Sequence, residues 1–228
     1  WNFPIYLAMG PLVTALAAGN RAMVKMSEIT PATNAVFKRL LAEVFDEDLV
    51  AVVGEELVDP NVFSSLPFDH IVFTGSPGVG RIVMRSASQN LTPVTLELGG
   101  KSPAVVSRHY PLADAARRIT HGKSVNCGQI CIAPDYALVP RDRQGEFVAA
   151  VQASFAGMYG ARTEGNPNFT SVVSDRQLQR LQAALDDARS KGATVTACAP
   201  LPPAGNRQLP LHIVTGATPD MTVLQEEL

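Results

Sequence analysis

Cys131 is the residue of this sequence best suited to nucleophilic chemistry. It lies between a helix-like run at 112–125 and a strand-like run at 136–139. Gly128 allows close backbone approach, and Pro134 stops a helix from continuing. We therefore expect the thiol at the end of an element, where backbone N–H groups favour the reactive thiolate. For a single cysteine, a buried and unreactive thiol is the alternative interpretation.

Glu97 and Asn2 are two polar residues that also adjoin predicted elements. Hydrophobic and polar residues alternate over 94–98, which predicts a strand ending near Glu97, and two glycines follow. Asn2 precedes an apolar run, 5–18, that predicts a helix. Taken alone, Glu97 is equally typical of an exposed strand end, and Asn2 is equally typical of a helix cap.

Lys25 and Glu28 lie at the carboxyl end of a predicted strand at 21–26. Open α/β sheets bind nucleotides at the carboxyl ends of their strands, so this pair is a candidate nucleotide site. Two solvated loop charges are the alternative interpretation.

The segment from Gly75 to Gly80 lies between a predicted strand at 68–74 and a predicted helix that starts near 79. Ser76 is a candidate cap for that helix, whose N-terminal N–H groups suit a pyrophosphate. The glycine spacing matches neither the dinucleotide fingerprint nor the P-loop. A plain tight turn therefore explains these glycines equally well.

Together these stretches resemble the motifs of a known family. Gly-Gln-x-Cys-x-Ala around Cys131 resembles the nucleophile motif of the NAD(P)-dependent aldehyde dehydrogenases, and the Pro-Asp-Tyr that follows resembles their class 3 branch. The other family motifs occur in the expected order, including Glu-Leu-Gly-Gly-Lys at 97–101. The resemblance covers essentially the whole chain.

This resemblance implies a covalent mechanism with no metal. Cys131 would be the nucleophile, and Asn2 together with the backbone N–H of Cys131 would form an oxyanion hole. Glu97 would be the general base that activates water to hydrolyse the thioester. The implied substrate is a small aldehyde, aromatic or medium-chain, with coniferyl-type aldehydes preferred.

The resemblance also implies NAD as the cofactor. A carboxylate beside the ribose 2′-hydroxyl repels the extra phosphate of NADP, although NADP is left open. Met26 stands where the family motif usually has proline. The residues at cofactor-binding positions are Lys25 and Glu28 for the adenosine ribose, Gly75, Ser76 and Gly80 for the pyrophosphate, and Glu227 for the nicotinamide ribose.

The expected fold class is α/β, with a partial Rossmann-like cofactor-binding domain at 1–98 followed by a partial α/β catalytic domain at 99–228. Both ends of the chain resemble the middle of family motifs, so we expect an internal fragment of a longer protein. In the second domain, Asp175, which follows Ser174, is a start signal for a long helix. We predict strands at 211–214 and 222–224.

Composition narrows the class of protein. The chain has 46% hydrophobic residues, 19 basic and 21 acidic residues, which describes a globular protein and gives no indication of nucleic-acid binding. Its three cysteines, an odd number, favour a reducing compartment, so we expect a cytoplasmic location. The resemblance implies a homodimer of the full-length protein.

Three other functions compete with aldehyde oxidation. A CoA-acylating relative would use the same cysteine but release the acyl group to a thiol, whereas Glu97 favours water. A reductase of acyl phosphates is disfavoured by the Glu-Leu-Gly-Gly-Lys motif. The third is a non-catalytic fragment that retains the fold, and the labelling rate of Cys131 would distinguish it.

Overall fold

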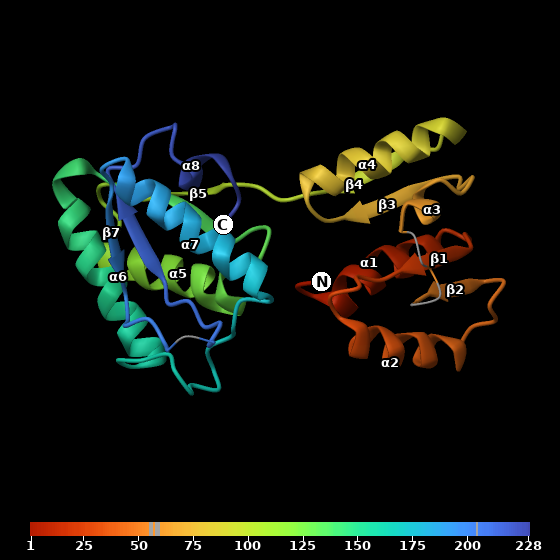
Figure 1. The fold of residues 1–228 in the computed structure, drawn as a ribbon, viewed down its shortest axis with the longest axis horizontal. Helices are drawn as coiled ribbons and strands as arrows, with labels where there is room; N and C mark the ends of the chain where they lie inside the picture. The colour runs from red at the N-terminus through yellow and green to blue at the C-terminus, as the bar shows by residue number, and fades with distance from the viewer. Residues whose placement is uncertain (55–56, 58–59, 204) are drawn as a thin grey trace. The chain divides into compact units, whose positions relative to one another are not determined.

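The computed structural model describes residues 1–54, 57, 60–203 and 205–228. The chain divides into two compact units, unit 1 (Trp1–Gly99) and unit 2 (Gly100–Leu228), whose elements are drawn in Figure 1. Both units combine helices with strands, which confirms the predicted α/β class. Within the described ranges, no helix is long and apolar enough to cross a membrane.

Unit 1 contains two β-α-β arrangements. Strands β1 and β2 pair in parallel and are connected through α2, while β3 and β4 pair in parallel and are connected through α4. Both α2 and α4 begin with proline, whose fixed φ and missing N–H suit the first helical position. The elements are α1 (Pro4–Ala17), β1 (Ala22–Lys25), α2 (Pro31–Ala42), β2 (Val50–Val53), α3 (Pro60–Ser64), β3 (Ile71–Thr74), α4 (Pro77–Ala87), the 3-10 turn η1 (Ser88–Asn90) and β4 (Val94–Glu97).

Two apolar clusters stabilise these arrangements. In the first, Leu12 of α1 packs with Phe37 of α2 and Val50 of β2. In the second, Ile71 of β3 packs with Val83 of α4. Because the helices are anchored to the strands, the loops at the carboxyl ends of β1 and β3 start from fixed positions.

Unit 2 has a parallel pair, β5 and β6, connected through α5, and an antiparallel pair, β7 and β8. Helices α5 and α6 pack on each other through a buried cluster that includes Ala116 and Phe147. The elements are β5 (Ser102–Val105), α5 (Leu112–Ser124), the 3-10 turn η2 (Val125–Gly128), β6 (Pro134–Leu138), the 3-10 turn η3 (Arg141–Arg143), α6 (Gln144–Tyr159), α7 (Asp175–Ser190), β7 (Thr194–Ala197), β8 (His212–Thr215) and α8 (Thr222–Gln225).

The strand predicted at 222–224 is wrong, because these residues begin the short helix α8. The backbone N–H of Thr222 donates to the Asp187 carboxylate on α7, at 2.8 Å. This contact satisfies an N–H group of the first helical turn, which a helix otherwise leaves without a partner. A contact between residues so far apart in the sequence favours a helix where the local apolar pattern suggests a strand.

Candidate active site

Cys131 lies in an exposed turn between η2 and β6. The turn is closed on its far side by a hydrogen bond from the N–H of Ala133 to the carbonyl of Ile130, at 3.0 Å. Among the residues that the structure describes, no oxygen accepts a hydrogen bond from the backbone N–H of Cys131. The turn therefore presents both a thiol and a backbone donor to a ligand.

The backbone just before this turn is left-handed over three residues. The φ angles are +51° at Asn126, +55° at Cys127 and +76° at Gly128. Residues with a Cβ rarely adopt this backbone conformation. At Gly128 a Cβ would also lie 2.9 Å from the backbone oxygen of Lys123, so the position requires glycine.

The other two cysteines differ from Cys131. The Cys127 thiol donates to the carbonyl of Leu209 at 3.5 Å, and burial raises its pKa. Burial also raises the pKa of Cys198, to about 11. A high pKa keeps a thiol protonated, so these two cysteines are suited to packing rather than to nucleophilic attack.

Glu97 lies at the end of β4 with its side chain exposed. It is paired in register with Thr74 of β3, and its carbonyl accepts a hydrogen bond from the N–H of Gly75 at 3.0 Å. This pairing brings the carboxylate and the first residue of the Gly75–Gly80 loop to the same edge of the β3–β4 pair.

The Gly75–Gly80 loop leads directly into α4. The Ser76 hydroxyl accepts a hydrogen bond from the N–H of Val79 at 3.4 Å, which confirms the predicted cap. A Cβ on Gly75 would overlap the Phe73 ring, and one on Gly80 would lie 2.7 Å from Leu98. Both glycines therefore allow close packing of the loop on the strands.

Lys25 and Glu28 come together after the carboxyl end of β1. The Lys25 Nζ lies 3.4 Å from the Glu28 carboxylate. A backbone N–H hydrogen bond, and then the Lys25 charge, lower the pKa of Glu28. Asn2 precedes α1, but Phe3 is the N-cap residue of that helix and makes no side-chain cap bond.

Glu227 lies in a segment that Lys101 holds in place. The Lys101 Nζ contacts the Asp135 carboxylate at 2.5 Å and donates to the carbonyls of Val223 at 2.9 Å and Glu226 at 2.8 Å. The Asp135 side chain is only 4% exposed. Partial removal from water raises the pKa of Glu227, although a backbone N–H of Gly100 opposes this shift.

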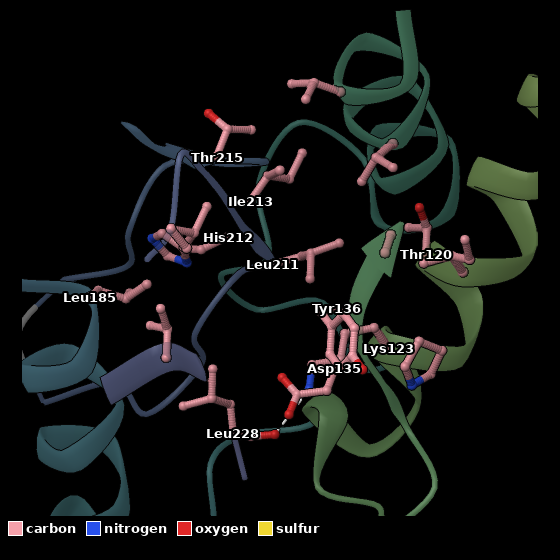
Figure 2. A pocket seen from close by; sticks show the side chains of 18 of the residues that line it. Thr120, Lys123, Asp135, Tyr136, Leu185, Leu211, His212, Ile213, Thr215 and Leu228 are labelled. Carbon is pink, nitrogen blue, oxygen red and sulfur yellow. Dashed lines mark hydrogen bonds between the residues drawn. The ribbon is translucent and has the colours of Figure 1, made fainter. Parts of the chain in front are cut away.

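A cavity of about 1140 Å³ lies in unit 2. Figure 2 shows Asp135 and Tyr136 of β6 on one side of it and Leu211, His212 and Ile213 on the other. Cys131 is not among the residues that line this cavity. The cavity is therefore not assigned to the candidate nucleophile.

The structure groups the predicted residues by unit. Asn2, the Lys25–Glu28 pair, the Gly75–Gly80 loop and Glu97 belong to unit 1, whereas Cys131 and Glu227 belong to unit 2. Sequence reasoning assigned no role to Lys101, Asp135 or Gln129, although all three lie within the quoted motifs. Each is a polar residue that lies next to or near a glycine or proline of these motifs, and this pattern could have identified them.

Comparison with known proteins identifies the family of the chain. The model of the aldehyde dehydrogenase family matches residues 1–228. A probable coniferyl aldehyde dehydrogenase of Pseudomonas aeruginosa is 54% identical over 229 residues, which cover 100% of this chain and 47% of that protein. The coniferyl aldehyde dehydrogenase of a Pseudomonas species is 46% identical, with 100% of this chain and 48% of that protein covered.

Solved structures give the same result. The substrate-bound state of Staphylococcus aureus AldH matches with a TM-score of 0.90 and 35% identity, covering 100% of this chain and 49% of that one. A Mycobacterium tuberculosis aldehyde dehydrogenase complexed with NAD+ matches with a TM-score of 0.87 and 31% identity, covering 100% and 48%. The chain spans about half the length of the curated relatives it matches. It belongs to the aldehyde dehydrogenase family.

Proposed function

We propose that the protein containing this chain oxidises an aldehyde to the carboxylic acid with NAD, through a thioester on Cys131. The observation that carries the proposal is the exposed turn at Cys131, where a thiol occurs beside a backbone N–H that donates to no oxygen of the described residues. Family membership supports the same chemistry.

In the proposed mechanism, the Cys131 thiolate adds to the carbonyl carbon of the aldehyde and forms a C–S bond. The carbonyl oxygen becomes an oxyanion, which the backbone N–H of Cys131 and the Asn2 side chain stabilise. Loss of hydride from the same carbon leaves a thioester. Glu97 then accepts a proton from water as the water attacks the thioester, and this step releases the acid and the thiolate.

The residues of unit 1 are suited to a dinucleotide. The N-terminus of the eleven-residue helix α4 presents the N–H of Gly78 beside the Ser76 cap, and closely packed glycines precede it. Lys25 and Glu28 would bind the adenosine ribose, and Glu227 would bind the nicotinamide ribose. When bound, NAD supplies the hydride acceptor. Relatives solved with NAD+ support NAD over NADP.

These assignments give each unit a role. Unit 1 would be the later part of the cofactor-binding domain, and unit 2 the first part of the catalytic domain. Coniferyl aldehyde is the preferred substrate, since two relatives that cover the whole chain carry that name. We also propose a cytoplasmic homodimer for the full-length protein, and the three free cysteines support the reducing location.

The test is a burst of NADH when the whole protein that contains this sequence meets NAD and coniferyl aldehyde. The matched control is Cys131→Ala, with Cys198→Ala as a second thiol variant. A burst in the wild type and in Cys198→Ala, but not in Cys131→Ala, is the expected result. No burst in the wild type with any aromatic or medium-chain aldehyde would refute the proposal. Acyl transfer to CoA in place of acid release would favour a CoA-acylating enzyme.

A further inference from the structure

We propose that Gln129 is a positioning residue for Cys131: its side-chain amide ties the left-handed turn before the thiol to the segment 171–173. The proposal deepens the function proposed above and rests on Cys131 as the nucleophile.

The Gln129 amide makes hydrogen bonds in two directions. Its Nε2 donates to the carbonyl of Asn126 at 2.8 Å, inside the left-handed turn, and to the carbonyl of Ser171 at 3.2 Å. Its Oε1 accepts from the backbone N–H of Val173 at 2.9 Å. One side chain therefore connects the turn to both ends of a segment more than 40 residues away.

The segment that Gln129 grips is itself fixed. Val172, between the two contacts, is only 1% exposed, and its N–H donates to the carbonyl of Arg207 at 2.9 Å. The turn is consequently tied to a packed part of unit 2 rather than to a free loop.

The turn needs such a tie. Asn126 and Cys127 have a left-handed conformation that residues with a Cβ rarely adopt. Relaxation of this turn would therefore lower the free energy of the backbone. Packing and the hydrogen bond to Leu209 support Cys127, but Cys131 and Ile132 are both exposed, so packing does not hold the turn at the thiol itself. Among the described residues, the Gln129 amide links the strained turn to the packed segment 171–173, beside the Cys127 contact with Leu209.

A thiol that must approach a carbonyl carbon depends strongly on position. A displacement of about 1 Å can cost about 10²-fold in rate. We therefore expect Gln129→Met, which keeps the side-chain length but removes all three hydrogen bonds, to lower kcat by about 10²-fold. The KM for NAD should change by less than about twofold, because the residues assigned to the cofactor are untouched.

Gln129→Glu provides a second variant. Its carboxylate can still accept from the N–H of Val173 but faces the carbonyls of Asn126 and Ser171 without a proton to donate. Gln208→Met is the matched control, because the buried Gln208 amide also donates to a backbone carbonyl, that of Phe169 at 2.9 Å. Within the described ranges its side-chain hydrogen bonds go to Asn206 and Phe169 and not to the turn, so Gln208→Met should lower stability and leave kcat within about twofold.

The experiment measures kcat, the KM for NAD and amide hydrogen exchange at 126–133 in the whole protein. We expect both Gln129 variants to lower kcat and to speed exchange at 126–133 at least tenfold, with neither effect in Gln208→Met. Unchanged kcat in folded Gln129 variants, an equal loss in Gln208→Met, or loss of folding in the Gln129 variants alone would overturn the proposal. If the wild type makes no NADH, the proposed function fails, and unchanged exchange would separately refute the tie.

Discussion

Replacing Lys101 with methionine is expected to lower the unfolding free energy of unit 2 by about 3 kcal/mol. The substitution removes the ammonium that contacts the Asp135 carboxylate, whose side chain is 4% exposed. Breaking a buried ion pair by removing one member costs roughly 3–5 kcal/mol. We take the lower end because the Lys101 side chain is 20% exposed and water can replace part of the lost contact.

The partner substitution should cost less. Asp135→Asn removes the buried charge and leaves the more exposed ammonium of Lys101, still bonded to the carbonyls of Val223 and Glu226. We expect a loss of roughly 1.5–2 kcal/mol, the lower part of the range for a hydrogen bond to a charged group. In the double variant Lys101→Met, Asp135→Asn, the loss should be smaller than the sum of the single losses, because no charge is left buried alone.

Urea unfolding followed by circular dichroism measures these changes. With a slope of about 2 kcal/mol per M, a loss of 3 kcal/mol lowers the midpoint by about 1.5 M. Lys191→Met is the matched control. The Lys191 ammonium also contacts a carboxylate, that of Asp187 at 2.8 Å, and donates to the backbone carbonyl of Asp220 at 2.6 Å. That pair is 34% and 26% exposed, so its loss should cost less than about 1 kcal/mol. Equal losses at Lys101 and Lys191 would refute the reasoning from burial.

Three further outcomes are expected. In urea unfolding, Gly128→Ala should lower the unfolding free energy by about 1–2 kcal/mol, because the φ of Gly128 is +76° and a Cβ would meet the Lys123 carbonyl. The control Gly145→Ala, on the exposed face of α6, should not lower it. At pH 8, iodoacetamide should label Cys131 much faster than Cys198, whose pKa is raised to about 11; equal rates by peptide mass spectrometry would contradict this. Burial, aided by Arg189, lowers the pKa of His212 from its usual value near 6.5, so folding favours its neutral form. Stability should therefore fall as the pH drops from about 7 to 5, and a His212→Gln variant that keeps the same slope would count against this cause.

Local signals in the sequence were sufficient for many elements. Ser76 caps α4 as predicted, although the helix begins at Pro77 rather than near 79. The start signal at Asp175 matches the first residue of α7, which Ser174 caps through the N–H of Gln177. Such signals act within one helical turn and need no tertiary context. The α8 helix was missed because its first N–H is satisfied by Asp187, a residue on another helix.

The same distinction applies to the candidate site. Lys25 and Glu28 lie three positions apart, so the sequence already places them together. The contacts of Gln129 with 171–173 and of Lys101 with 223–226 join distant segments, and no local pattern encodes them. The left-handed backbone at Cys127 was also unpredictable, because cysteine rarely adopts this conformation unless the surrounding structure supports it.

The Lys101 contacts also have a consequence for the kinetics of folding. They join residues that are 122 and 125 positions apart in the sequence. Closing so long a loop is entropically costly, and we expect these contacts to form after the transition state. Their loss should then accelerate unfolding and leave the refolding rate nearly unchanged. Lys101 would thus determine how long unit 2 remains folded rather than how quickly it folds.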